Sequence, residues 1–365
     1  MTAAAMPGSV HIIGTGLIGT SIGLALRRAG VDVTLEDPRT DHLQGAVAAG
    51  AGLAWDGSVS PVLVVVAAPP RPTGEVIADA TRRFPGVAVT DVASIKSVVL
   101  QDAREAGADM SHVVGGHPMA GRETSGPAGA RADLLDDRLW VITPTAEVDT
   151  EAVRMVHRLI TACGAYPVEM TPQEHDRAVA LVSHLPQVLA SSLAAQLVEA
   201  RSEDVRIAGQ GLRDMTRIAG SNVPMWSDII AGNAGPIAET LAAVVAELQI
   251  TQSLLADLER APSDAQAIDG IEGLLARGGR GRESIPGKHG AQAAQYAVVS
   301  VMIEDKPGQL GRLFVVAGDA GVNLEDVRIE HVLGRPSGLV DLFVQPADAG
   351  RLTEALRGQG VDVRA

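Results

Sequence analysis

The segment Gly14–Gly19 (GTGLIG) constrains the fold of this 365-residue chain more than any other feature. It follows the apolar run Val10–Ile13 and opens a helical pattern that ends at Gly30. In such a unit the first glycine allows a tight turn, the second lets the backbone approach a pyrophosphate, and the third lets helix and strand pack closely. The alternative is a glycine-rich turn without a cofactor. We predict a dinucleotide site, with the phosphates at the helix N-terminus, formed by Gly14, Gly16, Leu17, Ile18 and Gly19.

An acidic pair ends the next predicted strand, about 20 residues further on, where a carboxylate would bond the ribose hydroxyls. Asp37 is the preferred residue because it lies at the very end of the strand, and Glu36 is the close second. A carboxylate there repels a 2′-phosphate, which favours NAD over NADP as the cofactor. Arg39 argues the other way, because a nearby arginine can accommodate that phosphate.

Residues 1–170 alternate between short apolar runs and helical stretches. Several runs are apolar without alternation, as expected for strands that are buried on both faces. We therefore predict an α/β domain with a Rossmann-like, doubly wound and largely parallel sheet. Its strands are expected at Val10–Ile13, Val31–Leu35, Val62–Ala68, Val87–Val92, Val113–Val114, Trp140–Ile142 and Tyr166–Val168.

The remaining chain divides by pattern into three parts. Residues 171–277 are Ala- and Leu-rich and helical, beginning with a Thr171–Glu174 capping box. So much apolar helical surface needs a partner, and a second subunit is a reasonable one. The Gly-rich residues 278–294 are interpreted as a linker. Residues 295–365 follow a βαββαβ order, which predicts a small ferredoxin-like domain.

Composition excludes several classes of protein. A net charge of −14, from 30 basic and 44 acidic residues, argues against a general nucleic-acid surface. The single cysteine, Cys163, excludes an internal disulfide framework and a thiolate-rich zinc site. No uninterrupted apolar run reaches the roughly 18 to 20 residues of a membrane span. We expect a cytoplasmic protein without a metal, nucleic-acid or membrane partner.

His117 is the strongest candidate for chemistry. It lies in Gly115–Gly121 (GGHPMAG), after the predicted strand Val113–Val114, and ligands of such sheets bind beyond the carboxyl ends of strands. Pro118 restricts the backbone of His117, although an ordinary surface histidine remains the alternative. Ser94 is predicted to start a helix after another strand, where it could cap the helix or orient an imidazole.

Two helical segments carry further candidates. His175 and His184 are nine residues apart, which places them on opposite faces of a straight helix, and each could be a satisfied core histidine. Pro186 removes a backbone hydrogen bond and frees the carbonyl of Val182, which predicts a kink in this otherwise apolar helix. Arg213 and Arg217 are spaced to share one helical face and could bind a carboxylate, or belong to a solvated charged surface.

Five motifs together resemble the prephenate and arogenate dehydrogenases of tyrosine biosynthesis. They occur in family order over about residues 8 to 275. They are GTGLIGTS at Gly14–Ser21, DVASIK at Asp91–Lys96, GGHPMAGRETSG at Gly115–Gly126, HDRAVALVSHLP at His175–Pro186 and LRDMTRIAGSNVPMW at Leu212–Trp226.

The resemblance implies a homodimeric enzyme that uses NAD for the oxidative decarboxylation of prephenate or arogenate. His117 matches the histidine that accepts the hydroxyl proton, Ser94 its orienting partner, and Arg217 the arginine that holds a substrate carboxylate. Many members have histidine where this chain has Gln187, so the choice between prephenate and arogenate stays open. The residues that match positions lining or gating the site are Glu123, His175, His184 and Asp214.

The C-terminal part resembles an ACT domain. Asp305–Leu313 (DKPGQLGRL) matches its strand-to-helix turn, with Asp305, Pro307 and Gly308 as candidate regulatory residues. The resemblance implies an amino-acid site at the N-terminus of that helix and feedback inhibition by tyrosine. A purely structural or dimerising module is the alternative.

Two other functions compete with this hypothesis. A related β-hydroxyacid dehydrogenase would need a lysine acid or base in the helical part, and residues 173–227 contain no lysine. A non-catalytic sensor of NAD and amino acids has no need for His117, Ser94 and Arg217 together. We therefore favour prephenate dehydrogenase.

Overall fold

The computed structural model describes residues 6–122, 124, 126–285, 296–331 and 337–364. The chain divides into two compact units, Met1–Ala246 and Glu247–Ala365. The division falls within helix α11 (Ala234–Arg260) rather than at the predicted boundaries after residues 170 and 277. The reason is packing: helices that follow residue 171 lie against α3 and α4 of the preceding α/β part, so both parts belong to the first unit.

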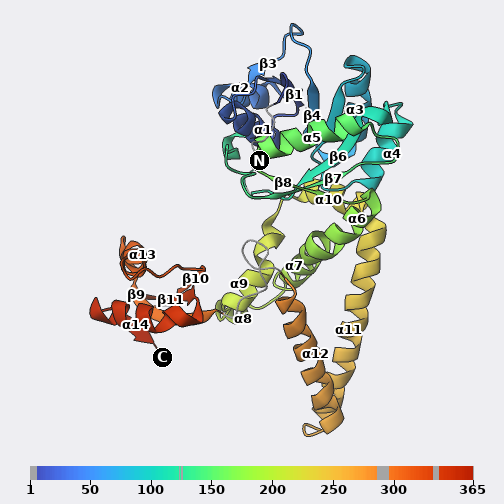
Figure 1. The fold of residues 1–365 in the computed structure, drawn as a ribbon. Helices are drawn as coiled ribbons and strands as arrows, with labels where there is room; N and C mark the ends of the chain where they lie inside the picture. The colour runs from blue at the N-terminus through green and yellow to red at the C-terminus, as the bar shows by residue number, and fades with distance from the viewer. Residues whose placement is uncertain (1–5, 123, 125, 286–295, 332–336, 365) are drawn as a thin grey trace. The chain divides into compact units, whose positions relative to one another are not determined.

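An eight-stranded sheet forms the centre of the first unit (Figure 1). Its order is β3-β2-β1-β4-β5-β6-β7-β8. Strands β1 to β3 are added toward one edge of the sheet, and β4 to β8 continue from β1 toward the opposite edge. Neighbouring strands are parallel except β6 and β7, and the short edge strand β3 was not predicted. The strands are β1 (Val10–Ile13), β2 (Val33–Glu36), β3 (Leu53–Ala54), β4 (Leu63–Val66), β5 (Ala88–Asp91), β6 (Val113–Pro118), β7 (Leu139–Thr143) and β8 (Tyr166–Glu169).

Side chains of the central strands enter two hydrophobic clusters, one on each face of the sheet. Ile12 and Val65 belong to one cluster, whereas Ile13 and Val64 belong to the other. Strands β1, β4 and β5 are buried throughout, which explains their lack of polar alternation. The doubly wound fold is confirmed. The helices between the strands are α1 (Leu17–Arg28), α2 (Thr40–Ala48), α3 (Pro70–Arg83), α4 (Ser97–Glu105) and α5 (Thr150–Ala162), with 3₁₀ turns at Met110–His112 and Pro127–Gly129.

Strand β6 is longer than predicted and includes His117. Its first residues pair with β5 in parallel, and Gly115 to Pro118 then pair with β7 in antiparallel register. Gly115 and Gly116 permit this, because a Cβ on Gly115 would lie 2.4 Å from the Thr143 hydroxyl. A Cβ on Gly116 would lie 2.5 Å from the carbonyl oxygen of Asp91. Gly115 and Gly116 therefore serve close strand packing.

The helical part of the first unit begins at α6 (Pro172–Val179), with the predicted capping box of Thr171 and Glu174. A π-helical segment, η3 (Ala180–His184), follows directly before Pro186, where a free carbonyl was expected. The next elements are α7 (Leu185–Ala195), α8 (Ser202–Arg206), α9 (Gln210–Thr216), the 3₁₀ turn η4 (Arg217–Gly220), α10 (Val223–Gly232) and α11.

Two helical stretches of the described chain are long and apolar enough to cross a membrane by length and composition alone. They are Pro172–Ala195, with a mean hydropathy of 1.5, and Ala234–Arg260, with 1.3. Neither stretch is an uninterrupted apolar run, because small and polar residues are interspersed along both helices, so neither was predicted from the sequence. The first stretch carries the buried polar side chains of His175, Asp176 and His184, which face other parts of the protein.

The second unit contains α12 (Ala265–Glu283) and a four-stranded antiparallel sheet of order β10-β11-β9-β12. Helix α12 runs through Gly278, so the predicted start of a linker there is wrong. Arg280 and Arg282 lie in its last turn, where they interact favourably with the helix dipole. Residues 286–295 of the predicted linker lie outside the described residues.

The sheet-forming segment of the second unit has the succession βαββαβ. Its hydrophobic core includes Val301, Leu313, Val340 and Leu356. The elements are β9 (Ala297–Glu304), α13 (Gln309–Asp319), β10 (Asp326–His331), β11 (Ser337–Val344), the 3₁₀ turn η6 (Pro346–Asp348), α14 (Ala349–Gly358) and β12 (Asp362–Arg364).

Candidate active site

The glycine loop between β1 and α1 has the geometry of a phosphate cradle. Gly14 has φ +103°, and a Cβ there would lie 2.3 Å from the carbonyl oxygen of Ala67. A Cβ on Gly19 would lie 2.0 Å from the carbonyl oxygen of Gly14, whereas nothing lies within 4 Å of one on Gly16. Gly16 also precedes α1 without a side-chain cap. The loop therefore leaves space and backbone N–H groups, at Leu17 and Ile18, for an anionic group.

The acidic pair after β2 separates into two different environments. Asp37 accepts hydrogen bonds from the backbone N–H of Thr15 (2.6 Å) and from its hydroxyl (2.9 Å), which ties the carboxylate to the glycine loop. Glu36 instead binds Arg83 at 2.6 Å and His11 at 3.2 Å. Burial opposes its ionisation, but Arg83 and His11 outweigh burial and lower the pKa of Glu36. Asp37 is thus the carboxylate at the glycine loop, whereas Glu36 is engaged by Arg83 and His11.

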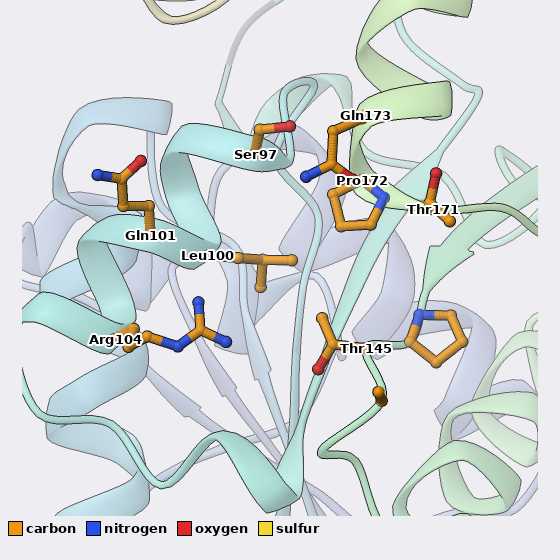
Figure 2. Close-up of a pocket in the computed structure, with 10 residues that line it drawn as sticks. Ser97, Leu100, Gln101, Arg104, Thr145, Thr171, Pro172 and Gln173 are labelled. Carbon is orange, nitrogen blue, oxygen red and sulfur yellow. The ribbon is translucent and has the colours of Figure 1, made fainter.

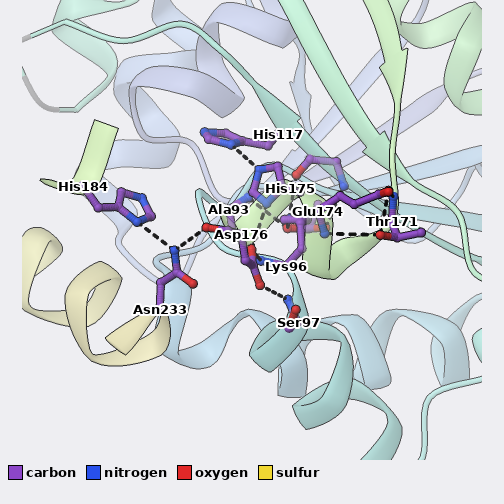
Figure 3. A network of polar contacts seen from close by, with 12 residues as sticks. Ala93, Lys96, Ser97, His117, Thr171, Glu174, His175, Asp176, His184 and Asn233 are labelled. Atoms are coloured by element: carbon purple, nitrogen blue, oxygen red, sulfur yellow. Dashed lines mark hydrogen bonds and ion pairs between the residues drawn. The ribbon is translucent and has the colours of Figure 1, made fainter. Parts of the chain in front are cut away.

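The imidazole of His117 is held by a second imidazole (Figure 3). Nδ1 of His117 lies 2.9 Å from Nε2 of His175, and the rings meet edge to face. Burial lowers the pKa of His117 well below 6.5, and His175, Lys96 and His184 lower it further, while Asp176 opposes them. His117 is therefore neutral near neutral pH, as a general base requires.

Asp176 contacts the nitrogen of His175 that is not engaged with His117. This residue was not predicted from the sequence. Its Oδ1 is 2.8 Å from Nδ1 of His175, and its carboxylate accepts the backbone N–H groups of Lys96 and Ser97 at the start of α4, both at 2.8 Å. Burial opposes ionisation, but the hydrogen bonds from His175, Ser97 and Lys96 outweigh it and lower the pKa of Asp176 to about 2. Its place directly after His175 in a capped helix was the available signal.

A buried ion pair fixes the backbone that carries His117. The fully buried ammonium of Lys96 contacts the carboxylate of Asp91 and donates to the carbonyl of Gly116 at 2.7 Å. Asp91 accepts the backbone N–H of Gly116 at 3.0 Å. Burial lowers the pKa of Lys96, and the charge of Asp91 opposes that shift. Both residues lie in the DVASIK motif, yet neither was singled out from the sequence.

His184 joins the same network from the π-helical segment. Its Nδ1 lies 3.0 Å from the amide nitrogen of Asn233, which also donates to the carbonyl of Asp176 at 2.8 Å. Burial lowers the pKa of His184 to about 4. The charge of Asp176 opposes this shift, and His175 adds to it. The prediction of opposite faces for His175 and His184 is wrong, because the wider π turn changes the angular phase between them.

Ser94 departs from its predicted place. Helix α4 begins at Ser97, three residues later than predicted, because the carboxylate of Asp176 from α6 accepts the first N–H groups. Among the described residues no hydrogen bond joins Ser94 to His117, whose Nδ1 contacts His175 instead.

The other predicted site residues lie on neighbouring elements. Helix α9 ends at Thr216 and Arg217 begins η4, so Arg213 and Arg217 do not share one helix as predicted. Asp214 accepts a hydrogen bond from Gln210 at 2.7 Å. Gln187 is buried, with Ser191 and Ser221 each 3.4 Å from its amide. Glu123 lies outside the described residues.

A separate pocket of about 500 Å³ lies beside the N-termini of α4 and α6 (Figure 2). Its lining includes Ser97, Leu100, Thr145 and Gln173. Arg104 at its margin pairs with Glu147 at 2.6 Å. The pocket does not include His117 or the glycine loop.

A doubly wound sheet with an open glycine loop and a neutral, half-buried imidazole defines a nucleotide-binding domain equipped for proton transfer. The family models agree with that class. The model for the prephenate dehydrogenase nucleotide-binding domain matches residues 22–169, and the model for the prephenate dehydrogenase dimerization domain matches residues 171–263. The chain belongs to the prephenate dehydrogenase family, and is therefore an oxidoreductase.

Individual relatives match over most of the chain. A probable prephenate dehydrogenase of Streptomyces niveus is 37% identical over 95% of this chain and 96% of its own. The prephenate dehydrogenase of Bacillus subtilis is 26% identical over 99% and 97%. The crystal structure of Aquifex aeolicus prephenate dehydrogenase with hydroxyphenyl propionate and NAD⁺ matches with a TM-score of 0.65. That structure is 26% identical and covers 75% of this chain and 98% of its own.

Proposed function

We propose that the chain converts prephenate into 4-hydroxyphenylpyruvate by NAD-dependent oxidative decarboxylation, a step of tyrosine biosynthesis. The neutral imidazole of His117, fixed between β6 and α6, is the observation that carries this function. Membership of the family supports the reaction, and the complex of a relative with NAD⁺ supports the cofactor.

Different residues of this chain would bind NAD, bind the substrate and transfer the proton. The glycine loop would hold the pyrophosphate and Asp37 the ribose hydroxyls of NAD. Bound NAD would supply the acceptor for the hydride from the ring carbon that bears the hydroxyl. His117 would take the hydroxyl proton as the hydride leaves and return it to the phenolate oxygen once the ring is aromatic, and Arg217 would bind a substrate carboxylate. The electron pair of the breaking carbon–carboxylate bond completes the aromatic ring as carbon dioxide leaves.

Gln187 leaves arogenate as the second candidate substrate. Arogenate carries an amine where prephenate has a keto group, and an uncharged amide can donate to one or accept from the other. We propose prephenate because the relatives with high coverage bear that name. Glu123, His175, His184 and Asp214 are proposed to line or gate the site around Gln187.

Parallel assays test both substrates. Purified protein should reduce NAD with prephenate, with NADP as the cofactor control. Turnover with arogenate alone would make the chain an arogenate dehydrogenase that forms tyrosine directly. No turnover with either substrate, despite measured NAD binding, would leave the non-catalytic sensor as the better hypothesis.

We propose that residues 295–365 form an ACT-like regulatory domain that binds an amino acid such as tyrosine. The βαββαβ succession supports this, as does Gly308, which has φ +88° and precedes α13. Asp305 and Pro307 are exposed in the preceding turn. Removing residues 295–365 should abolish inhibition by tyrosine while turnover remains. Unchanged inhibition would place the effector elsewhere.

We propose that the enzyme is a cytoplasmic homodimer. Exposed apolar side chains along α11, including Leu248, Ile250 and Leu255, need a cover, and the family model for this part describes a dimerization domain. Light scattering of protein purified without detergent should give the mass of two chains. A monomer, or protein that stays in the membrane fraction, would contradict the proposal.

A further inference from the structure

The carboxylate of Asp176 links the first turn of α4 to the two imidazoles of the site (Figure 3). We propose that Asp176 is a positioning residue: through His175 it determines which nitrogen of His117 carries a proton. The inference rests on the proposed function only in taking His117 as the base. The placement of the protons is a property of the protein without substrate.

The direction of each hydrogen bond follows from the chemistry of the carboxylate. An ionised carboxylate accepts hydrogen bonds and cannot donate them. Nδ1 of His175, 2.8 Å from Asp176, must therefore carry a hydrogen. In a neutral imidazole the other nitrogen then has the lone pair. With His175 neutral, its Nε2 is an acceptor and lies toward Nδ1 of His117.

The same reasoning sets the tautomer of His117. Its Nδ1 lies 2.9 Å from the acceptor Nε2 of His175, so this Nδ1 carries the hydrogen. The lone pair of neutral His117 is then on Nε2, the nitrogen that remains for the substrate. Without the carboxylate, both rings could reverse, and a hydrogen on Nε2 would block proton transfer.

Asp176 also compensates the charge that forms during the reaction. When Nε2 of His117 accepts the substrate proton, the ring becomes an imidazolium while Nδ1–H still donates to His175. The four titratable groups that shift the pKa of His117 most are His175 and Asp176 from α6, His184 from η3, and Lys96 from the segment before α4; Asp91, paired with Lys96, also lies beside Gly116 on β5. Only Asp176 among these four favours the positive charge.

The competing explanation is that Asp176 only caps α4. A cap contributes to stability, with a typical cost of about 1 kcal/mol when it is lost, and would leave the tautomer and the base unchanged. Stability alone therefore cannot distinguish the two roles. Turnover, its pH profile and the ring nitrogens can.

The first experiment uses the full-length protein with Asp176→Asn. We expect kcat at saturating NAD and prephenate to fall about 10- to 100-fold, below the roughly 10⁴-fold loss known for a wrong tautomer in a serine protease triad. The acid limb of the pH profile should move to lower pH, because His117 loses the charge that raises its pKa. The Kd of NAD should be unchanged. Unchanged kcat and acid limb, with only a lower Tm, would overturn the proposal.

Glu174→Gln is the matched control. Glu174 is an exposed carboxylate on the same helix, and it also accepts backbone hydrogen bonds at a helix start, but it does not contact either imidazole. Its replacement should leave kcat and the pH profile as in the wild type. An equal loss in both variants would assign the effect to α6 as a whole and overturn the proposal.

A double-mutant cycle tests whether Asp176 acts through His175. Asp176→Asn should cost little further kcat in a His175→Asn background, because the link to His117 is already broken. Full additivity of the two losses would show that Asp176 acts independently, which contradicts the proposal.

Nitrogen NMR of the histidine rings separates this inference from the proposed function. In the wild type, the signal that disappears in His117→Asn should show hydrogen on Nδ1 and none on Nε2 near neutral pH. Asp176→Asn should populate the reverse tautomer. If the protein shows this pattern but does not turn over prephenate, the role of Asp176 in setting the tautomer is supported and the proposed reaction is contradicted. Hydrogen on Nε2 in the wild type would overturn the inference even in an active enzyme.

Discussion

Asp37 and Thr15 are joined by two hydrogen bonds, one from the backbone N–H of Thr15 and one from its hydroxyl. The carboxylate that ends β2 is therefore held against the glycine loop that follows β1. Its neighbour Glu36 is bound to Arg83 and His11 instead. The pair thus offers a direct comparison between a carboxylate tied to the glycine loop and one bound to Arg83 and His11, one residue apart.

Asp37→Asn should weaken NAD binding and reduce discrimination against NADP. A hydrogen bond to a charged group is worth about 1.5–3 kcal/mol, which corresponds to a Kd roughly 10- to 100-fold higher. The loss of negative charge also removes repulsion of a 2′-phosphate. Calorimetric titration with both nucleotides measures the two effects, and an unchanged ratio of the Kd values would contradict the assignment of Asp37.

Glu36→Gln is the control for that experiment. It should lower the Tm, because Arg83 and the buried His11 lose a charged partner. The Kd of NAD should change little. A larger effect on NAD than that of Asp37→Asn would reverse the roles of the two residues.

Two glycines of the loop, Gly16 and Gly19, should respond differently to alanine. Gly19→Ala places a Cβ 2.0 Å from a backbone oxygen and should destabilise the domain, whereas Gly16→Ala meets nothing within 4 Å. We expect Gly16→Ala to keep the wild-type Tm while it weakens NAD binding, since its Cβ occupies the space left for the pyrophosphate. Thermal unfolding with and without NAD checks this. Normal NAD binding by Gly16→Ala would place the pyrophosphate elsewhere.

His117→Asn should reduce kcat severely without unfolding the protein. Removal of a general base typically costs about 10²- to 10⁴-fold. Because the pKa of His117 is well below 6.5, the wild-type acid limb should also lie below that pH. Steady-state rates across pH, with circular dichroism as the folding control, test both statements. A variant with near wild-type kcat would exclude His117 as the base.

His184 should make the protein less stable in acid. Its pKa is about 4 in the folded protein and 6.5 in the unfolded chain, so the unfolded state binds the proton first as pH falls. Stability is therefore lost between pH 6.5 and about 4, by up to about 3 kcal/mol. His184→Asn should flatten this part of the stability profile. Parallel profiles for wild type and His184→Asn would contradict the pKa shift.

The nucleotide-binding half could be predicted because its signals are local. The glycine loop, the buried strands and the capping box at Thr171 each depend on residues close together in the chain. The order of strands then follows from the rules of doubly wound sheets. Strand β3 has only two exposed residues and offers no hydrophobic pattern to detect.

The site network could not be predicted to the same degree, because it depends on contacts between distant segments. Asp176 replaces Ser94 as the group at the start of α4, and no propensity of the α4 sequence reveals a cap donated by another helix. The π turn brings His184 into the network, although Pro186 had indicated an irregularity. The predicted strand ended at Val114, but the lack of side chains at Gly115 and Gly116 allows β6 to continue beside β7.

The most direct test of the account is a product balance in one reaction of the full-length protein with prephenate and NAD. The account predicts equal amounts of NADH, carbon dioxide and 4-hydroxyphenylpyruvate, and a matched loss of all three in His117→Asn. Reduction of NAD without release of carbon dioxide, or no reduction of NAD by protein that binds it, would contradict oxidative decarboxylation as the function of this chain.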